Sequence, residues 1–481
     1  MTPVAPVPLA ELGRVHFTGI GGAGMSGIAR IMLARGVAVS GSDAAAGGQL
    51  DSLTALGADV HVGHAASHLA GADTLVVSSA IRPDNPELAA ARAHGLRILP
   101  RAAALASVML GRRGVAVAGT HGKTTTTGMI TTALRHIGAD PGYVIGGILT
   151  ETGLGAEDGK GEVFVAEADE SDASFLMLTP EVAVVTCIEA DHLDNYPGLA
   201  EIEAAFTAFA RQIVAGGVLI ACADDPGART LAAAAASGGI RVRSYGEAAD
   251  ADYRVSSVRT AGMSVSLAVS AAQAAGPGGA ETVWLTIGVP GRHNALNGAA
   301  AYAAVRELGV AAGPAADGVA AYRGTGRRME RKGEAAGVLV LDSYAHHPTE
   351  LAADLRAARG IRDGQVIAVF QPHLFSRTRI FAGEFGAALG LADKVFVLDV
   401  YAAREDPEPG VTGELVASAV PGGRAVFASG RDGAPGRDGL PDAVAEVARP
   451  GDLVLTMGAG DVTMLGPQIV AALAARSGDT V

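Results

Sequence analysis

The segment Gly119-Thr-His-Gly122-Lys123-Thr124 has the residue types that bind the phosphates of a nucleotide. An apolar run before it predicts a buried strand, and the pattern after it predicts a helix. It is not a full P-loop motif, because the position of the first glycine holds Val117. Backbone amides of such a loop surround a phosphate, the lysine reaches the β- and γ-phosphates, and the threonine hydroxyl can bind Mg²⁺. A lysine that only begins a helix would face an unfavourable helix dipole, so we expect a nucleotide site.

Two acidic segments follow later apolar runs, EADESD from Glu167 and EADHLD from Glu189. Mg²⁺ prefers a few carboxylates together with phosphate oxygens, so acids at strand ends beside a phosphate loop suit it. Glu167 and His192 come directly after their strands, at the edge where ligands bind in parallel sheets, and we expect both to be metal ligands. For Asp169, Glu170 and Asp172, an acidic rim in contact with water is an equally good interpretation.

A second glycine-rich turn lies near the start of the chain. Its sequence, GIGGAG from Gly19 to Gly24, matches G-x-G-x-x-G between a predicted strand and a predicted helix, and Asp43 follows nineteen residues later. The glycines let the backbone approach a diphosphate, and the acid can accept from a ribose hydroxyl. Taken alone, the motif indicates a dinucleotide-dependent dehydrogenase, and a tight turn without a ligand is the structural alternative.

The remaining candidate ligands are weaker. His61, His64 and His68 could suggest zinc, but their spacing offers no fourth ligand, and a surface loop or the rim of a ligand site is the better interpretation. The two cysteines, Cys187 and Cys222, form neither a disulfide framework nor a metal-ligand pattern, as expected in a reducing compartment.

Three successive stretches of alternating strand and helix would position these residues. The alternation predicts an α/β fold with parallel sheets covered on both faces. Arg/Gly-rich connections near Gly111 and Gly326 divide the 481 residues into three domains. We expect a Rossmann-like domain over 1–110, a central P-loop-type ATPase domain with a parallel sheet over 111–326, and a Rossmann-like C-terminal domain over 327–481.

Charge and hydropathy restrict the class of partner. The net charge is −13 and there is no basic stripe, which argues against nucleic acid or an anionic membrane as a partner. The N-terminal segment lacks the pattern of a signal peptide, and no apolar run reaches the ~20 residues of a membrane helix. We therefore expect a cytoplasmic protein that acts on small molecules.

Nine segments spread in order along the chain resemble one family, the Mur ligases. They are HFTGIGGAGMSGIA, GTHGKTTTT, EADESDASF, IEADHLDNY, GRHNALNGAAA, GTGRRMERKG, SYAHHPTEL, FQPHLFSRTR and DVYAARE. The resemblance is greatest to the branch that adds alanine. It implies an ATP-dependent ligase of peptidoglycan precursor synthesis with UDP-N-acetylmuramate and L-alanine as substrates. It also implies two Mg²⁺ ions, which Mn²⁺ can replace, and a monomer or weak homodimer.

The resemblance implies a role for each matching residue. The first loop would hold the UDP-sugar and not NAD, through Gly19, Gly21, Gly22, Ala23, Gly24, Met25 and Asp43. ATP would contact Gly119, Thr120, His121, Gly122, Lys123, Thr124 and Thr125, with His293, Asn294 and Asn297 at the adenine and Arg327 and Asp342 from the third domain. Thr124 and Glu167 would hold one metal ion and His192 a second. Tyr344, His347, His373 and Arg377 would face the alanine, and Lys123, His192, His347 and Arg377 would be catalytic.

The chain departs from the family pattern at a few positions. Ser343 stands where an aspartate is commoner, and Leu374 stands where an arginine is frequent. Sibling ligases use a carbamylated lysine, but this chain has no lysine between Lys160 and Lys332. The alanine-adding branch lacks that lysine too.

The implied chemistry is activation of a carboxylate as an acyl phosphate, followed by attack of the alanine amine. His192 and His347 are both candidates for the general base. Three other functions stay open. An oxidoreductase would leave GTHGKTTTT unexplained, and a non-catalytic nucleotide-binding regulator would not need His347 or Arg377. A ligase that re-adds recycled murein peptide shares most motifs, but GIGGAGMSG fits the alanine-adding type better. For Arg377, capping of its own helix is the structural alternative.

Overall fold

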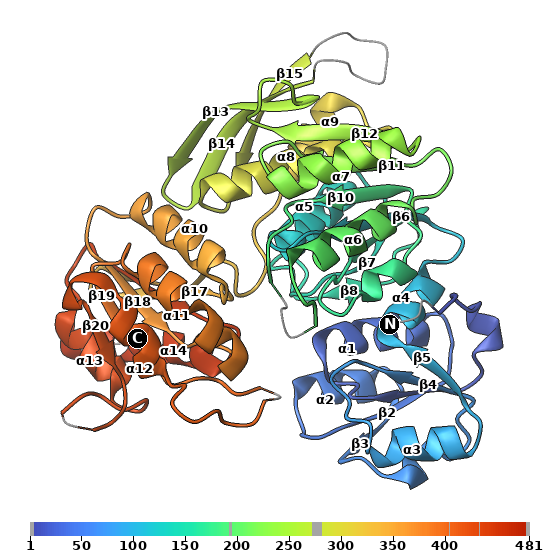
Figure 1. The fold of residues 1–481 in the computed structure, drawn as a ribbon, viewed down its shortest axis with the longest axis horizontal. Coiled ribbons are helices and arrows are strands. Elements are labelled where there is room, and N and C mark those ends of the chain that lie inside the picture. Colours follow the sequence, from blue (N-terminus) through green and yellow to red (C-terminus); the bar gives the residue numbers. More distant parts are fainter. Residues whose placement is uncertain (1–3, 192–194, 272–280, 404, 432, 478–481) are drawn as a thin grey trace. The chain divides into compact units, whose positions relative to one another are not determined.

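The computed structural model describes residues 4–191, 195–271, 281–403, 405–431 and 433–477 (Figure 1). Their contacts divide the chain into two compact units. The first unit contains Met1–Ser256, Ala268–Leu285 and Leu296–Tyr322, and the second contains Ser257–Leu267, Thr286–Ala295 and Arg323–Val481.

A five-stranded parallel sheet begins the first unit, in the order β3-β2-β1-β4-β5. Every residue of β1 is buried, as expected of a central strand covered on both faces. Because the chain leaves β1 for β2 on one side and later adds β4 on the other, the strand order reverses at β1. The carboxyl end of β1 therefore lies at the position where such sheets bind ligands. The strands are β1 (Val15–Thr18), β2 (Val39–Asp43), β3 (Asp59–Val62), β4 (Thr74–Val77) and β5 (Arg97–Pro100), and the helices are α1 (Ala23–Ala34), α2 (Gly48–Ala55), α3 (Pro86–Ala93) and α4 (Arg101–Met109).

A ten-stranded sheet follows, in the order β15-β14-β13-β12-β11-β10-β6-β9-β7-β8. Its central strand β6 pairs in parallel with β9 and β10, so the carboxyl ends of the three strands meet at one edge. The strands are β6 (Arg113–Ala118), β7 (Gly142–Val144), β8 (Ala156–Glu157), β9 (Val163–Glu167), β10 (Val182–Val185), β11 (Val218–Cys222), β12 (Arg241–Gly246), β13 (Tyr253–Ala261), β14 (Ser264–Ala271) and β15 (Glu281–Ile287). The helices are α5 (Lys123–His136), α6 (Leu199–Ala210), α7 (Pro226–Ser237), α8 (Arg292–Glu307) and α9 (Ala312–Ala320).

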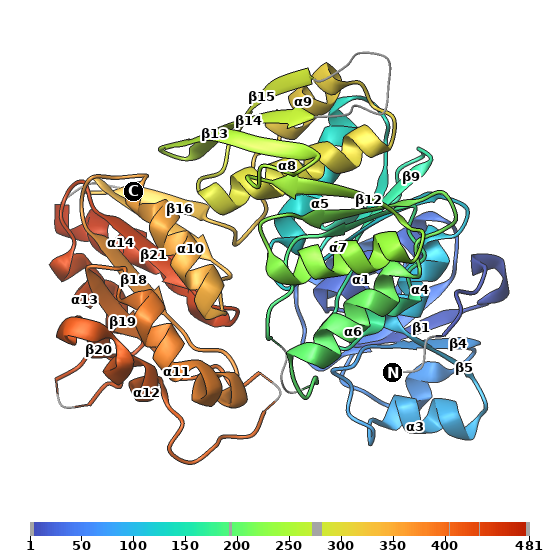
Figure 2. The ribbon, with the colours of Figure 1, turned by 45° about the horizontal axis from the view of Figure 1, so that its top comes forward.

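The second unit has a six-stranded sheet in the order β16-β17-β21-β18-β19-β20, in which β16 alone is antiparallel to its neighbour (Figure 2). Alternate residues of its strands point to opposite faces, so Leu339 and Leu341 join one apolar core while Val338 and Val340 join another. The strands are β16 (Glu330–Ala335), β17 (Val338–Ser343), β18 (Val366–Phe370), β19 (Lys394–Val397), β20 (Ala425–Phe427) and β21 (Leu453–Met457). The helices are α10 (Pro348–Arg359), α11 (Phe375–Leu389), α12 (Gly413–Ala419), α13 (Leu440–Val447) and α14 (Leu465–Ser477).

These three sheets with helices on their faces confirm the predicted α/β fold class. The strand predicted before the first glycine-rich turn is β1, and the helix predicted after it is α1. The domain bounds 1–110, 111–326 and 327–481 stay predictions. Among the helices that the structure describes, none has the length and apolar character that crossing a membrane requires.

Candidate functional site

The predicted phosphate loop connects β6 to α5, which begins at Lys123. Gly119 and Gly122 adopt φ angles of 131° and 83°, which favour glycine. A Cβ on Gly119 would lie 2.0 Å from Thr186 Oγ1, and one on Gly122 would lie 2.6 Å from Asn297 Oδ1. The loop is therefore closely packed, and it presents the amides that begin a 14-residue helix, a suitable place for a phosphate.

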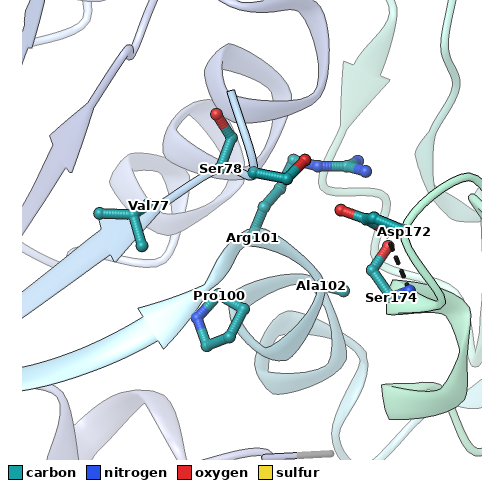
Figure 3. A pocket seen from close by; sticks show the side chains of 8 residues that line it. Val77, Ser78, Pro100, Arg101, Ala102, Asp172 and Ser174 are labelled. Carbon is teal, nitrogen blue, oxygen red and sulfur yellow. Dashed lines mark hydrogen bonds between the residues drawn. The ribbon is translucent and has the colours of Figure 1, made fainter. Parts of the chain in front are cut away.

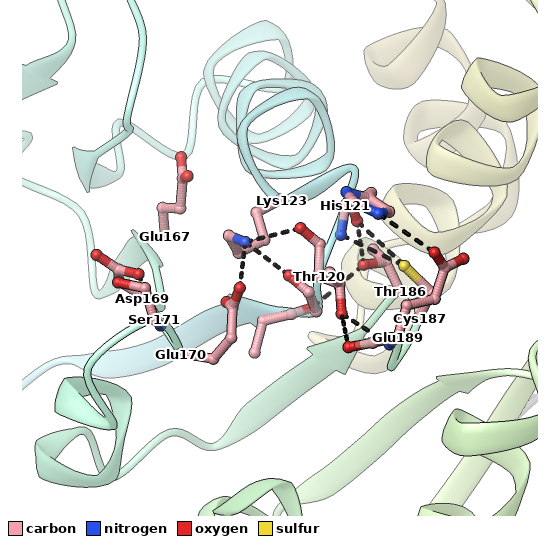
Figure 4. A network of polar contacts seen from close by, with 12 residues as sticks. Thr120, His121, Lys123, Glu167, Asp169, Glu170, Ser171, Thr186, Cys187 and Glu189 are labelled. Carbon is pink, nitrogen blue, oxygen red and sulfur yellow. Dashed lines mark hydrogen bonds and ion pairs between the residues drawn. The ribbon is translucent and has the colours of Figure 1, made fainter. Parts of the chain in front are cut away.

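The Lys123 ammonium lies over this loop (Figure 4). Its Nζ donates to Gly119 O at 2.7 Å and Thr120 O at 3.1 Å, and it pairs with Glu170 Oε1 at 2.9 Å. Burial would lower the pKa of Lys123, but the carboxylates of Glu170 and Asp169 outweigh burial and hold that pKa above its ordinary value. The side chain therefore stays cationic, as binding of a phosphate requires.

Thr124 and Glu167, which the resemblance assigns to one metal ion, lie in contact with each other. The Thr124 hydroxyl donates to Glu167 Oε1 at 3.0 Å, and Gly146 N donates to Glu167 Oε2 at 2.7 Å. Glu167 ends β9, the parallel neighbour of β6. A hydroxyl and a carboxylate at a phosphate loop are the oxygen donors that Mg²⁺ prefers, so the two residues fit a metal ion. His192 lies outside the described residues.

The other acids of the first acidic segment have separate roles. Glu170 is 2% exposed, so an acidic rim in contact with water is the wrong interpretation for this residue. Asp169 pairs with Arg101 at 2.8 Å. Burial would raise the pKa of Asp169, but Arg101 and Lys123 hold it below its ordinary range. Asp172 Oδ1 accepts from Ser174 N at 3.0 Å, so it orders the chain locally.

Residues after β10 support the loop from its other side (Figure 4). Thr186 Oγ1 donates to His121 O, and the Cys187 sulfur accepts from His121 N at 3.3 Å. Thr120 Oγ1 accepts from Glu189 N at 2.9 Å. Sequence reasoning missed Thr186 and Cys187. The available signal was their position at the carboxyl end of the strand next to β6.

The predicted adenine residues divide between the two units. In the first unit, Asn297 of α8 is 7% exposed and lies beside Gly122. In the second unit, His293 Nε2 lies 3.6 Å from Asp354 Oδ1, and Asn294 Nδ2 donates to Pro290 O at 2.7 Å. Burial lowers the pKa of His293, which favours its neutral form. Their contact with an adenine stays a prediction.

The first glycine loop follows β1. Gly19 N and Ile20 N donate to Ser42 O at 2.8 and 3.0 Å, and Gly21 N donates to Asp43 Oδ2 at 2.9 Å. A Cβ on Gly21 would lie 2.9 Å from that same oxygen, so the loop and the acid are in close contact. Asp43 therefore holds the loop itself, a role in addition to the predicted contact with a ribose.

A pocket of about 90 Å³ lies near this loop within the first unit. Figure 3 shows Val77 and Pro100 on one side and Asp172 and Ser174 on the other, with Arg101 between them. Arg101 also lies close to the first loop, because a Cβ on Gly24 would be 2.9 Å from its Nη1. One cation thus connects the first glycine loop to the acidic segment beside the phosphate loop. Nothing in the sequence pattern singled out Arg101.

Arg327 and Asp342 pair in the second unit, with Arg327 Nε 3.2 Å from Asp342 Oδ2. Arg327 has a φ of 61° and donates from Nη2 to Gly458 O at 2.6 Å. Asp342 is fully buried and accepts from Thr456 Oγ1 at 2.7 Å and Thr463 Oγ1 at 2.8 Å. The pair is fixed by the ends of β17 and β21.

The predicted amino-acid residues follow β17 and β18, which flank β21. Tyr344 stacks beneath the Arg327 guanidinium at 5.0 Å. His347 is the N-cap of α10, where its Nδ1 accepts from Thr349 N at 3.4 Å. His373 stacks on Tyr401 with 5.8 Å between ring centres. These positions share one edge of the sheet, and their contact with alanine stays a prediction.

Arg377 is 7% exposed within α11. Of the two departures from the family pattern, Ser343 has a local explanation and Leu374 has none in the structure. The Ser343 hydroxyl donates to Asp354 and accepts from Ala345 N at 3.0 Å, so it organises the chain after β17. Leu374 is 5% exposed with a φ of 69°, immediately before α11.

Three models of one protein family match successive parts of this chain. The family model described as "Mur ligase family, catalytic domain" matches residues 14–113, "Mur ligase middle domain" matches 117–305, and "Mur ligase, glutamate ligase domain" matches 327–460. The UDP-N-acetylmuramate–L-alanine ligase of Thermobifida fusca is 56% identical over 480 residues, which cover 98% of this chain and 99% of that protein. The enzyme of the same name from Acidothermus cellulolyticus is 52% identical over 98% and 97% of the two chains.

Solved structures are also similar. The UDP-N-acetylmuramate–alanine ligase of Thermotoga maritima superposes with a TM-score of 0.78 at 27% identity, over 96% of this chain and 99% of that one. A murein peptide ligase from Psychrobacter arcticus superposes with a TM-score of 0.69 at 25% identity, over the same shares of the two chains.

Proposed function

We infer that this chain, which belongs to the Mur ligase family, joins L-alanine to the lactyl carboxylate of UDP-N-acetylmuramate and uses ATP to drive the reaction. The observation that carries this inference is the 56% identity over nearly the full length of both chains to a ligase of that name. The enzyme forms ADP, and its product is a precursor of peptidoglycan.

The phosphate loop of the first unit supplies the groups that the first step needs. A carboxylate and an amine do not condense usefully in water, because the carboxylate lacks a leaving group. The lactyl carboxylate therefore attacks the γ-phosphate of ATP and forms an acyl phosphate. Lys123 is cationic, and its ammonium is held at the phosphate loop by the Gly119 carbonyl 2.7 Å away. From this position it can neutralise charge on the phosphoryl group as that group is transferred.

Thr124 and Glu167 would hold a Mg²⁺ ion, and His192 a second ion. When bound, the metal withdraws charge from the phosphate oxygens. Two ions, and replacement of Mg²⁺ by Mn²⁺, are part of this proposal. What supports the first ion is the 3.0 Å contact between the Thr124 hydroxyl and the Glu167 carboxylate at the phosphate loop.

Each remaining site residue has a proposed partner. The first glycine loop and Asp43 hold the UDP-sugar, and Asn297 lies at the adenine with His293 and Asn294. Arg327 and Asp342 contact ATP. Tyr344, His347, His373 and Arg377 bind the alanine, whose amine then attacks the acyl carbon as phosphate leaves. The general base is His192 or His347, and the contact of His347 Nδ1 with Thr349 N restricts a catalytic role of His347 to its other nitrogen.

The alternatives receive less support. If this chain re-added recycled murein peptide, we would expect its structure to be more similar to a murein peptide ligase than to an alanine-adding ligase. The TM-score is instead 0.69 for the murein peptide ligase and 0.78 for the alanine-adding ligase. An oxidoreductase would have no use for Lys123, Thr124 and Glu167 as the structure arranges them. We further propose that the protein is cytoplasmic, a monomer or weak homodimer, and without a nucleic-acid or membrane partner.

Phosphate release tests the proposed function. The purified chain is incubated with ATP, Mg²⁺ and UDP-N-acetylmuramate, and each amino acid of a panel, and then the tripeptide of recycled murein, is added in turn. A separate sample receives NAD(H) in place of ATP. We expect phosphate and ADP to form with L-alanine. Formation of phosphate only with the tripeptide of recycled murein would contradict the proposal in favour of the sibling ligase, and oxidation or reduction of NAD(H) would favour the dehydrogenase.

A further inference from the structure

A buried carboxylate beside the first glycine loop takes no part in the proposed reaction. Glu87 lies in the first turn of α3 and is fully buried. Its Oε2 accepts from Thr18 Oγ1 and Ser42 Oγ, both at 2.7 Å. Its Oε1 accepts from Ala65 N at 3.3 Å and lies 3.1 Å from His68 Nδ1. A buried charge is costly unless it is hydrogen-bonded or paired, and this carboxylate accepts hydrogen bonds at both of its oxygens.

Histidines surround the same carboxylate from separate elements. His16 of β1 is fully buried, with Nε2 3.4 Å from Glu87 Oε2 and Nδ1 2.9 Å from Ser40 Oγ. His64 Nδ1 lies 3.7 Å from Oε2 and 2.8 Å from Ser42 Oγ. In the part of the chain that the structure describes, His61, His64 and His68 do not form a cluster of three metal ligands. Two of these histidines, His64 and His68, instead lie beside the Glu87 carboxylate.

The contacts of Glu87 lead directly to the first glycine loop. The Ser42 side chain binds Glu87, while the Ser42 carbonyl accepts from Gly19 N and Ile20 N. The next residue, Asp43, accepts from Gly21 N through its side chain and from Gly63 N through its carbonyl at 2.7 Å. One carboxylate therefore fixes the strand end that orders the loop.

We propose that Glu87 is a positioning residue for the UDP-sugar. It fixes Ser42 and the histidine-containing segment 61–68, and these contacts keep the first glycine loop in the conformation that binds the UDP-sugar. The proposal rests on the proposed function, because that function assigns the loop to the UDP-sugar. Glu87 is fully buried beneath the strand ends and acts through Ser42. Its loss should therefore weaken binding of the UDP-sugar and leave the ATP site unchanged.

The test uses two variants and two matched controls. Glu87→Gln keeps the shape of the side chain but places an amide donor opposite the donors that now surround it. Ser42→Ala breaks the connection between Glu87 and the loop while the other contacts of Glu87 stay in place. Ser40→Ala removes an equally buried hydroxyl two residues earlier on β2, one that binds His16 and not Glu87. Glu11→Gln makes the same chemical change at an exposed glutamate of the same domain.

Binding of UDP-N-acetylmuramate is measured by titration calorimetry, and the KM values for the UDP-sugar and for ATP are measured by phosphate release. We expect Glu87→Gln and Ser42→Ala to raise the Kd and KM for the UDP-sugar about tenfold or more, with less than a twofold change in KM for ATP. Both controls should resemble the wild type. If Glu87→Gln does not fold, Ser42→Ala alone decides the outcome.

Equal changes in both KM values, or an unchanged Kd in Ser42→Ala, would overturn the proposal and leave Glu87 a purely structural residue. An effect of Ser40→Ala as large as that of Ser42→Ala would also overturn it. Failure of the proposed function gives a different result, because the wild type itself would then neither bind UDP-N-acetylmuramate nor release phosphate with it.

Discussion

Lys123 shows how a side chain can be prepared for a phosphate by its own loop. Two backbone carbonyls and the Glu170 carboxylate surround its ammonium, so the cation is fixed at the beginning of α5. A phosphate at this helix N-terminus would find both the backbone amides and the cation in place. Preorganised charge of this kind stabilises a transferring phosphoryl group without reorganisation during the reaction.

Replacing Lys123 with alanine should therefore remove nearly all turnover and leave the fold intact. The loss of a group directed at a transferring phosphoryl group commonly lowers the rate by ~10²–10³-fold or more. The measurement is kcat for ADP formation, with circular dichroism to establish the fold. Lys160→Ala, at an exposed lysine of the first unit, is the matched control. More than a tenth of wild-type activity in a folded Lys123→Ala variant would show that the lysine acts elsewhere.

Arg377 should determine the affinity for alanine. The methyl group of alanine gives only ~1 kcal/mol of discrimination, so the charged ends must supply most of the affinity. The amine has to react unprotonated, which leaves the carboxylate as the group to bind, and an arginine fork matches a carboxylate with two hydrogen bonds. Arg377 is 7% exposed, which suits a side chain directed into a site better than one that caps its helix.

We expect Arg377→Ala to raise the KM for alanine about tenfold or more, with little change in the KM for ATP. Alaninamide should be a poor substrate for the wild type and lose little further in the variant. Arg379→Ala is the control, because Arg379 lies on the same helix, is exposed and pairs with Glu408 at 3.0 Å. A similar rise in both KM values would instead assign Arg377 to the nucleotide or to the fold.

At the scale of the elements, the strands and the two glycine loops could be predicted from the sequence. Each of these depends on local pattern and on the rule that parallel strands present their carboxyl ends at one edge. Arg101 and Glu87 could not be predicted in the same way. Arg101 pairs with Asp169, which is 68 residues away and follows β9 of the ten-stranded sheet. The partners of Glu87 are 19 to 69 residues away, and the sheet order β3-β2-β1-β4-β5 brings them together.

The contacts of Glu87 also predict how stability depends on pH. Burial would raise the pKa of Glu87, but the nearby His16 ring and the hydrogen bonds from Ser42 and Thr18 outweigh burial and lower that pKa from 4.5 to about 2. A carboxylate whose pKa is lowered on folding stabilises the fold above its unfolded pKa, and this contribution is lost as the pH falls from about 4.5 toward 2. The titratable groups around it are His16 from β1, and His64 and His68 from the segment after β3.

Glu87→Gln should therefore lower the melting temperature at pH 6 by more than it does at pH 3. The difference in unfolding free energy between wild type and variant should shrink by about 2 kcal/mol over this range. Thermal unfolding is followed by circular dichroism, with Glu11→Gln as the control. A difference that stays constant from pH 6 to pH 3 would contradict an ionised Glu87 in the folded protein.

Across the described residues the molecule has three sheets, each with its ligand-binding candidates beyond the carboxyl ends of its strands. The first sheet carries the glycine loop and Asp43, the second carries Lys123 and Glu167, and the third carries Arg327 and the residues assigned to alanine. Three family models match these three parts in order. A ligase needs three substrates in one reaction, and the distribution of candidates over three sheets agrees with that requirement.

Transfer of isotope from the sugar nucleotide tests the central claim most directly. UDP-N-acetylmuramate labelled with ¹⁸O in its lactyl carboxylate is incubated with the wild-type chain, ATP, Mg²⁺ and L-alanine, and the products are analysed by mass spectrometry. The account predicts ADP, the alanyl product, and inorganic phosphate that carries one labelled oxygen, because the carboxylate oxygen leaves with the phosphate. Label found in AMP, or phosphate released without label, would contradict ligation through an acyl phosphate.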